Sequence, residues 1–340
     1  MSVGETTAPM AVSARVTGVP RLLGPLAVLT LGALAALLLA VTLGSVSLAP
    51  SQLFAVLLGE GEPLHRTLVL ELRLPRVLAA FATGGLLAVA GALMQVLLRN
   101  PLADPYVLGL SGGAAVGALL AMLGGLGAAM VSGSAFAGAL LSTLLVFGLA
   151  HGTGSWTPTR LLLTGVVVAA GWGALITFML AVGPAERLPG MLYWLMGDLA
   201  YARSPWPAMV ALALACLVAL PLGRSLNVLA RGPLQAASLG VPVRPLEWSI
   251  YIAASLLTAV AVTTAGTIGF VGLVVPHMLR LVLGNDQRLI LPAAALAGGT
   301  LLVLADALAR ILIAPEQLPV GVITAMLGVP AFLYLLYRSR

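Results

Sequence analysis

Long apolar stretches alternate with short polar segments along the whole chain. A bilayer-spanning helix needs about 20 mostly apolar residues, and most of these stretches reach that length. The expected helices cover residues 22–44, 77–98, 106–130, 134–150, 161–183, 206–222, 248–265, 266–283, 289–313 and 320–337. Pro276 is expected to break the eighth helix, because proline removes a backbone donor. The pattern predicts an all-α, polytopic membrane protein with about ten transmembrane helices.

The polar segments define the domain organisation. Residues 1–21 form a polar tail, and residues 22–340 form a single transmembrane domain in which 22–44 is retained as the first helix. Residues 45–72 are expected to be a polar loop. Residues 184–204 are amphipathic, with a short interfacial helix at 191–196. The longest polar connection of the second half covers residues 223–247.

Composition supports the membrane class. The chain is 60% hydrophobic and 8% charged, whereas soluble domains carry about 25% charged residues. All 17 basic residues are arginine, and a phosphate-binding loop of the GxxxxGK[ST] type needs a lysine. The chain therefore has no nucleotide-hydrolysing P-loop, and any ATPase is another polypeptide.

Other classes of site are also disfavoured. Cys216 is the single cysteine, so the chain forms no internal disulfide and no cysteine-cluster metal site. The three histidines show no metal-ligand spacing. The arginines lie between apolar runs without interleaved aromatics, which argues against nucleic-acid binding. We expect no catalytic residue, no metal site and no cofactor in this chain.

The arginines also predict the orientation of the chain. Cytoplasmic loops of membrane proteins carry an excess of basic residues. With the N-terminus inside, 11 of the 17 arginines fall on the inner side. These are Arg15, Arg21, Arg99, Arg160, Arg224, Arg231, Arg244, Arg280, Arg288, Arg338 and Arg340. Both termini are therefore predicted to be cytoplasmic.

Three arginines on the predicted outer side form the first candidate site. Arg73 and Arg76 are three positions apart and share a helix face, and Arg310 lies near the outer end of the ninth helix. A single arginine there is usually an interfacial anchor. Three together favour a docking site for a partner, because guanidinium groups pair well with carboxylates.

Asp306 is the only carboxylate well inside an apolar run. An intramembrane acid is a candidate proton relay. Arg310 follows four residues later, however, and that spacing allows a helical ion pair. We favour the structural ion pair over the relay.

A short helical stretch, GPLQAASLGV at 232–241, is the candidate coupling element on the cytoplasmic side. It reads either as a plain connecting loop or as a helix that fits a groove on a cytoplasmic motor. The residues assigned to coupling are Gly232, Pro233, Leu234, Gln235, Ala236, Ala237, Leu239 and Gly240. Met94 and Gln95 either line a transport pathway or pack in the core.

A short internal echo links the two halves of the chain. Gly91 precedes Arg99 by the same spacing as Gly272 precedes Arg280. Transporters are often built from repeated halves, but one short match can arise by chance.

Several motifs in a fixed order resemble the FecCD family of permeases, which serve ABC importers of iron chelates and cobalamin. They are RLPR at 73–76, NPLADPYVLGLSGGA at 100–114, GTIGFVGLVVPHMLR at 266–280, LADALAR at 304–310 and LPVGVITAMLGVPAF at 318–332. The resemblance covers residues 43–336 and implies the ABC type II importer permease fold in the inner (plasma) membrane of a prokaryote.

The resemblance also implies partners and a mechanism. The permease would act as a homodimer with the pathway at its interface, lined by the helices at 77–98 and 161–183. A cytoplasmic ABC ATPase dimer, carrying ATP and Mg, would dock at 232–241. A periplasmic or lipid-anchored binding protein would face Arg73, Arg76 and Arg310. The cargo would be an iron-siderophore, haem or cobalamin, moved by alternating access. The competing hypothesis is a proton-coupled secondary transporter that uses Asp306.

Overall fold

A computed structural model describes residues 20–338, apart from 45–47, 152–156, 201 and 203. The predicted tail at 1–21 therefore lies almost wholly outside the described residues. The described part of the chain is all-α and contains no strand, which confirms the predicted fold class.

Seven helices are long and apolar enough to cross a membrane, and three shorter apolar helices bring the number to the predicted ten. The ten helices are α1 Pro20–Thr42, α4 Leu74–Leu97, α5 Leu110–Leu123, α6 Ala128–His151, α7 Pro158–Val182, α9 Trp206–Leu229, α11 Val243–Ala265, α12 Val271–Leu283, α13 Gln287–Ile311 and α14 Val320–Arg338. The remaining elements are α2 Pro50–Leu57, α3 Pro63–Arg66, η1 Thr67–Arg73, η2 Pro105–Leu108, α8 Leu188–Met196 and α10 Pro233–Ser238.

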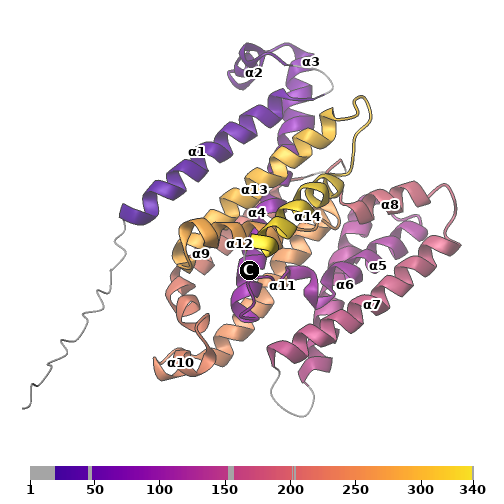
Figure 1. The fold of residues 1–340 in the computed structure, drawn as a ribbon. Helices are drawn as coiled ribbons and strands as arrows, with labels where there is room; N and C mark the ends of the chain where they lie inside the picture. Colours follow the sequence, from indigo (N-terminus) through magenta and orange to yellow (C-terminus); the bar gives the residue numbers. More distant parts are fainter. Residues whose placement is uncertain (1–19, 45–47, 152–156, 201, 203, 339–340) are drawn as a thin grey trace, which may run out of the picture.

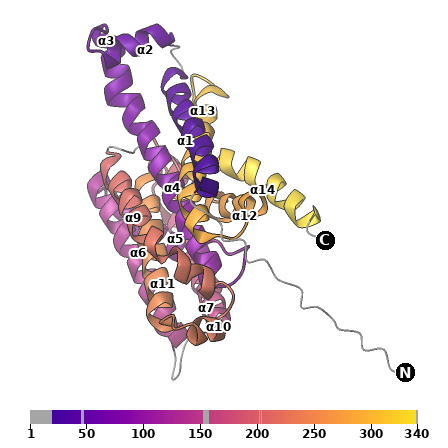
Figure 2. The same cartoon turned by 90° about the vertical axis from the view of Figure 1, so that its left-hand side faces the viewer.

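The helices form a bundle with two distinct ends (Figures 1 and 2). The short helices α2 and α3 lie at one end, which we call the α2 end, and α10 lies at the opposite end, the α10 end. Helices α5, α6 and α7 form one side of the bundle, and α1 runs along the other side against α13. The two ends carry the candidate sites.

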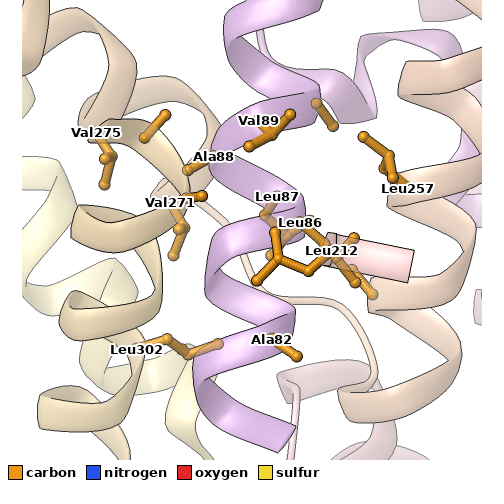
Figure 3. Packing of buried hydrophobic residues seen from close by; sticks show 14 of the residues in the cluster. Ala82, Leu86, Leu87, Ala88, Val89, Leu212, Leu257, Val271, Val275 and Leu302 are labelled. Carbon is orange, nitrogen blue, oxygen red and sulfur yellow. The ribbon is translucent and has the colours of Figure 1, made fainter. Parts of the chain in front are cut away.

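Helix α4 is the centre of the bundle. It packs against α9, α11, α12 and α13, whose apolar side chains surround it (Figure 3). Close approach depends on glycine: a Cβ at Gly91 would overlap the carbonyl oxygen of Gly272 on α12. Small residues at helix crossings allow this dense packing in a membrane. The sequence echo around Gly91 and Gly272 thus marks a direct helix crossing.

The prediction of a polar loop at 45–72 is wrong. The helix that contains α4 begins at Pro63 and runs through η1 to Leu97. Just before Pro75, the N–H of Leu74 bonds the carbonyl of Val69, five residues back. Proline would crowd the carbonyl four residues before it, and a widened π-turn relieves this crowding. The polar residues of this segment made it resemble a loop, although the helix continues through it toward the α2 end.

Other predicted boundaries are corrected at glycine turns. The expected helix at 106–130 is divided, because Gly109 has φ 68° and Gly125 has φ 70°, and Met130 belongs to α6. The break predicted at Pro276 lies earlier, at Gly266 and Phe270, and α12 continues through Pro276.

The polar connection at 223–247 is also shorter than predicted. Helix α9 continues to Leu229 and α11 already begins at Val243. The charged and polar residues near these ends extend the helices beyond the apolar core of the membrane. Only α10 and its two short flanking turns remain between them.

Candidate functional site

The three predicted outer arginines meet at one cavity at the α2 end. The cavity has a volume of about 790 Å³, and Arg73, Arg76 and Arg310 all line it. Four carboxyl and phenol side chains line it as well: Glu71, Tyr193, Asp198 and Glu316. Residues 237 positions apart in the sequence are thus brought to one site. The side chains that line this cavity include both positively and negatively charged groups.

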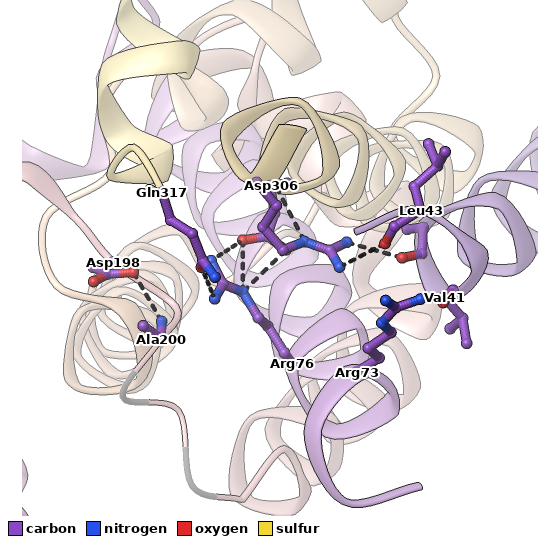
Figure 4. A network of polar contacts seen from close by, with 10 residues as sticks. Val41, Leu43, Arg73, Arg76, Asp198, Ala200, Asp306 and Gln317 are labelled. Carbon is purple, nitrogen blue, oxygen red and sulfur yellow. Dashed lines mark hydrogen bonds and ion pairs between the residues drawn. The ribbon is translucent and has the colours of Figure 1, made fainter. Parts of the chain in front are cut away.

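Asp306 lies between two of these arginines. Its Oδ1 is 2.9 Å from Nη2 of Arg76, and its Oδ2 is 3.1 Å from Nε of Arg310. Arg76 also donates from Nε to both carboxylate oxygens, at 3.0 and 3.2 Å. Figure 4 shows Arg76 and Asp306 pointing toward each other. The predicted ion pair between Asp306 and Arg310 is confirmed, and Arg76 is a second partner.

Arg73 and Arg310 hold the C-terminus of α1. The last carbonyls of a helix lack partners within it and carry the negative end of its dipole, so cations are favourable there. Arg73 donates to two of these carbonyls at 3.0 Å each, and Arg310 donates to two others at 3.0 and 2.9 Å. The acceptors are Val41, Thr42, Leu43 and Ala40.

These contacts leave the three arginines unequally accessible. Arg73 is 7% exposed and Arg310 is 6% exposed, whereas the side chain of Arg76 is 13% exposed. Arg76 also donates to Oε1 of Gln317, an exposed residue, at 2.7 Å. Two of the three predicted docking residues are therefore already committed to structure.

Sequence reasoning missed two polar residues of this cavity. Gln317 lies in the connection between α13 and α14, and Asp198 follows α8, where its side chain accepts from the N–H of Ala200 at 2.8 Å. Burial raises the pKa of the Asp198 carboxyl above its ordinary value. Neither residue lies on a periodic segment, so no sequence signal pointed to the cavity.

The predicted coupling element is a short, projecting helix at the α10 end (Figure 1). Leu234 is 87% exposed and Leu239 is 70% exposed, and Ala237 is exposed beside them. Ala236 is buried against the bundle. Gly232 and Gly240 flank the helix with φ 128° and 77°, conformations that favour glycine. The predicted apolar face is present, and no other described residue of this chain covers it.

Met94 and Gln95, predicted either to line a pathway or to pack in the core, are both buried. Met94 is fully buried and Gln95 is 3% exposed. The Gln95 amide bonds Arg280 and donates to the carbonyl of Leu273 at 3.2 Å. Met94 thus packs in the core, whereas Gln95 also lines a cavity at the α10 end.

Two of the sequence motifs are joined in space. Asp104 accepts from the N–H of Tyr106 at 2.7 Å and begins η2. The Tyr106 hydroxyl accepts from the N–H of Ile268 at 3.2 Å. The segment NPLADPYVLG is thereby fixed against GTIGF, at the turn that precedes α12.

The two ends differ in charge. Among the described side chains, those near the α10 end include seven arginines: Arg99, Arg160, Arg224, Arg231, Arg244, Arg280 and Arg288. Three carboxylates accompany them: Asp104, Glu247 and Asp286. The α2 end carries five arginines and seven carboxylates: Arg66, Arg73, Arg76, Arg187 and Arg310 with Glu60, Glu62, Glu71, Glu186, Asp198, Asp306 and Glu316. The net charge is thus +4 at the α10 end and −2 at the α2 end.

Comparison with known proteins extends over nearly the whole chain. The model of the FecCD transport family matches residues 32–338. The vitamin B12 import system permease protein BtuC of Vibrio cholerae is 40% identical over 82% of this chain and 85% of its own length. The hemin transport system permease protein HmuU of Yersinia pestis is 39% identical over 80% of this chain and 83% of its own length.

A solved structure agrees with the fold. A metal-chelate type ABC transporter in an inward-facing conformation superposes with a TM-score of 0.81 at 30% sequence identity. The match covers 92% of this chain and 98% of that protein. The similarity therefore includes the helices that carry both ends described above.

Proposed function

The chain belongs to the FecCD transport family, and on that premise we propose that it is the permease subunit of an ABC importer for a metal chelate. The observation that carries the proposal is the extent of the match, which includes nine of the ten apolar helices in full and α1 from residue 32 onward. The relatives named for vitamin B12 and hemin make cobalamin, haem or an iron-siderophore the proposed cargo class. The chain itself supplies no catalytic residue.

The ATPase would dock on α10. Leu234 and Leu239 are exposed apolar side chains on a helix that packs on the bundle through Ala236. A groove on a soluble partner that accepts such a helix would bury both leucines, and helix-in-groove docking is a common recognition mode. ATP and Mg would be held by that partner, which would drive alternating access.

A homodimer would place α7 at its interface. Of the seven candidate spans, α7 is the least buried, with 11% of its apolar window inside the bundle. Large exposed apolar side chains such as Leu163, Val167 and Phe178 cover it. A second copy would cover part of this surface and leave a wide, weakly binding pathway between the two chains, as a bulky cargo requires for release.

A periplasmic or lipid-anchored binding protein would dock at the α2 end. The cavity there presents Arg76 and Gln317 beside the two more deeply buried arginines. The excess of arginine at the α10 end supports an orientation with that end, and both termini, in the cytoplasm. We propose the inner (plasma) membrane of a prokaryote as its location.

The proton-coupled alternative rests on Asp306, and the geometry favours the importer over it. Both carboxylate oxygens are engaged by guanidinium groups, and the residue is fully buried. This is the arrangement of an ion-pair network. A relay carboxyl would instead need access to a water-filled path.

The first experiment is to purify the tagged chain from its native membrane under mild detergent and identify the co-purifying proteins by mass. We expect a soluble ABC ATPase in stoichiometric amount. Reconstituted with that ATPase and a binding protein, the chain should take up cargo only with ATP. Uptake that survives ATP depletion and collapses with the proton gradient would refute the proposal.

A further inference from the structure

A second large cavity lies at the α10 end, and its wall includes Arg231, which directly precedes the coupling element at 232–241. It has a volume of about 670 Å³ and is lined by the ends of α4, α9, α12 and α13. Four arginines from different segments converge on it: Arg99, Arg231, Arg280 and Arg288.

The charge of this cavity is only partly balanced. Asp286 is the one carboxylate among its lining residues. Arg288 contacts it at 2.7 Å, and the Asn227 amide donates to it at 2.8 Å. The hydrogen bond from Arg288 is the largest cause that lowers the pKa of Asp286 to about 2, so this pair is ionised and mutually neutral at pH 7.

The other three arginines form no ion pair with a carboxylate that lines the cavity. Arg280 is held by neutral acceptors, the Gln95 amide oxygen and the carbonyl of Ala92. Arg99 feels Glu247 electrostatically, although Glu247 does not line the cavity. Arg231 is exposed. About three positive charges, two of them on the exposed side chains of Arg99 and Arg231, therefore face one open cavity, which attracts anions.

A buried acceptor in the same wall provides a second, independent observation. Gln287 lines the cavity and is 2% exposed. Its Oε1 is buried and has no hydrogen-bond partner among the described residues. An unpaired buried acceptor is costly, so a hydroxyl donor on a bound molecule would satisfy this atom once the Gln287 side chain turns toward the cavity.

We propose that this cavity binds a phosphate-bearing anion. Arg99, Arg231 and Arg280 would contact the phosphate oxygens, and Gln287 would accept from a hydroxyl group of the ligand. A phosphatidylglycerol headgroup combines both features, and inorganic phosphate shares the same chemistry. Basic pockets between transmembrane helices recognise lipid headgroups in this way.

The surface beside the cavity suits a lipid. The last turn of α12 leaves Leu281 63% exposed and Val282 77% exposed, next to Arg280. An acyl chain along this surface would place its headgroup at the level of the arginines. The assignment of this lipid to the cytoplasmic leaflet rests on the orientation proposed above. The proposed binding of the lipid does not depend on which cargo the permease transports.

The test measures lipid binding to the full chain by native mass spectrometry in detergent. Phosphatidylglycerol and phosphatidylcholine are titrated separately, and inorganic phosphate is added as a competitor. We expect phosphatidylglycerol to bind more tightly. The variant R99Q/R231Q should bind it about 30-fold more weakly, from two arginine contacts. The matched control R224Q/R244Q removes two exposed arginines that do not line the cavity and should bind normally.

Each outcome decides something. Displacement by inorganic phosphate would support the site and show that the phosphate group alone suffices, whereas tight binding that phosphate does not displace would support it with lipid as the source. Equal binding of the two lipids, without phosphate binding, would overturn the proposal, as would equal effects of the two double variants. Loss of the ATPase from R99Q/R231Q with unchanged lipid binding would also overturn it, and would reassign these arginines to subunit docking.

Discussion

Removing the Asp306 carboxylate tests whether it is a structural ion-pair centre or a proton relay. In the variant D306A, the guanidinium groups of Arg76 and Arg310 lose four contacts with carboxylate oxygens, at 2.9 to 3.2 Å. Both side chains remain largely buried. The variant therefore leaves two like charges facing each other without the carboxylate between them.

The structure allows the cost to be bounded. Breaking a buried ion pair by removing one partner costs about 3–5 kcal/mol. For a chain of this length, about 1 kcal/mol corresponds to roughly 2 °C in Tm. We therefore expect D306A to unfold about 6–10 °C below the wild type. D306N keeps one acceptor oxygen, so its decrease in Tm should lie in the smaller half of that range.

The assay is thermal unfolding in detergent, followed by tryptophan fluorescence. The matched control is E316Q, which removes an exposed carboxylate lining the same cavity; an exposed site of this kind changes stability by about 0.5 kcal/mol or less. A D306N variant with unchanged Tm and abolished uptake would refute the structural reading. It would assign Asp306 to proton transfer.

Three further predictions concern other parts of the bundle. L234D/L239D should abolish co-purification of the ATPase without lowering Tm, because both side chains are exposed; a retained ATPase would contradict α10 docking. G91A should prevent folding or lower Tm sharply, since its Cβ would overlap α12, whereas G148A, with open space at its Cβ, should not; equal behaviour would refute the crossing. R73Q should raise amide hydrogen exchange at the end of α1 by about tenfold or more, because it loses the charge-assisted hydrogen bonds to the carbonyls of Val41 and Thr42; unchanged exchange would show that Arg73 does not hold that end.

The number of helices and the membrane class could be predicted because bilayer thickness imposes a minimum apolar length. The helix boundaries could not be predicted where backbone geometry determines them. The π-turn before Pro75 lets a helix continue through a segment that contains Glu71 and Arg66. The break before α12 includes Gly266 with φ 70° but also Phe270 with φ 68°, and a phenylalanine gives no signal for such a conformation.

The site was predictable only in part, for a related reason. The spacing of Asp306 and Arg310 on one helix indicated their ion pair, and the spacing of Arg73 and Arg76 indicated a shared face. The acceptors at the end of α1 are backbone carbonyls, which every residue carries. No pattern in the sequence could therefore show that Arg73 and Arg310 point at them.

This difference changes what a mutation at the α2 end can show. Charge reversal at Arg73 and Arg76 together would be the direct test of the predicted docking role. In the structure, Arg73 is buried on the C-terminus of α1, so its reversal would place a carboxylate against carbonyl oxygens. Loss of transport in that variant would then report a displaced helix as readily as a lost partner. Gln317, which is exposed and lines the cavity, is the position at which binding-protein docking can be separated from the integrity of the bundle, because Arg76 also holds the buried Asp306 carboxylate.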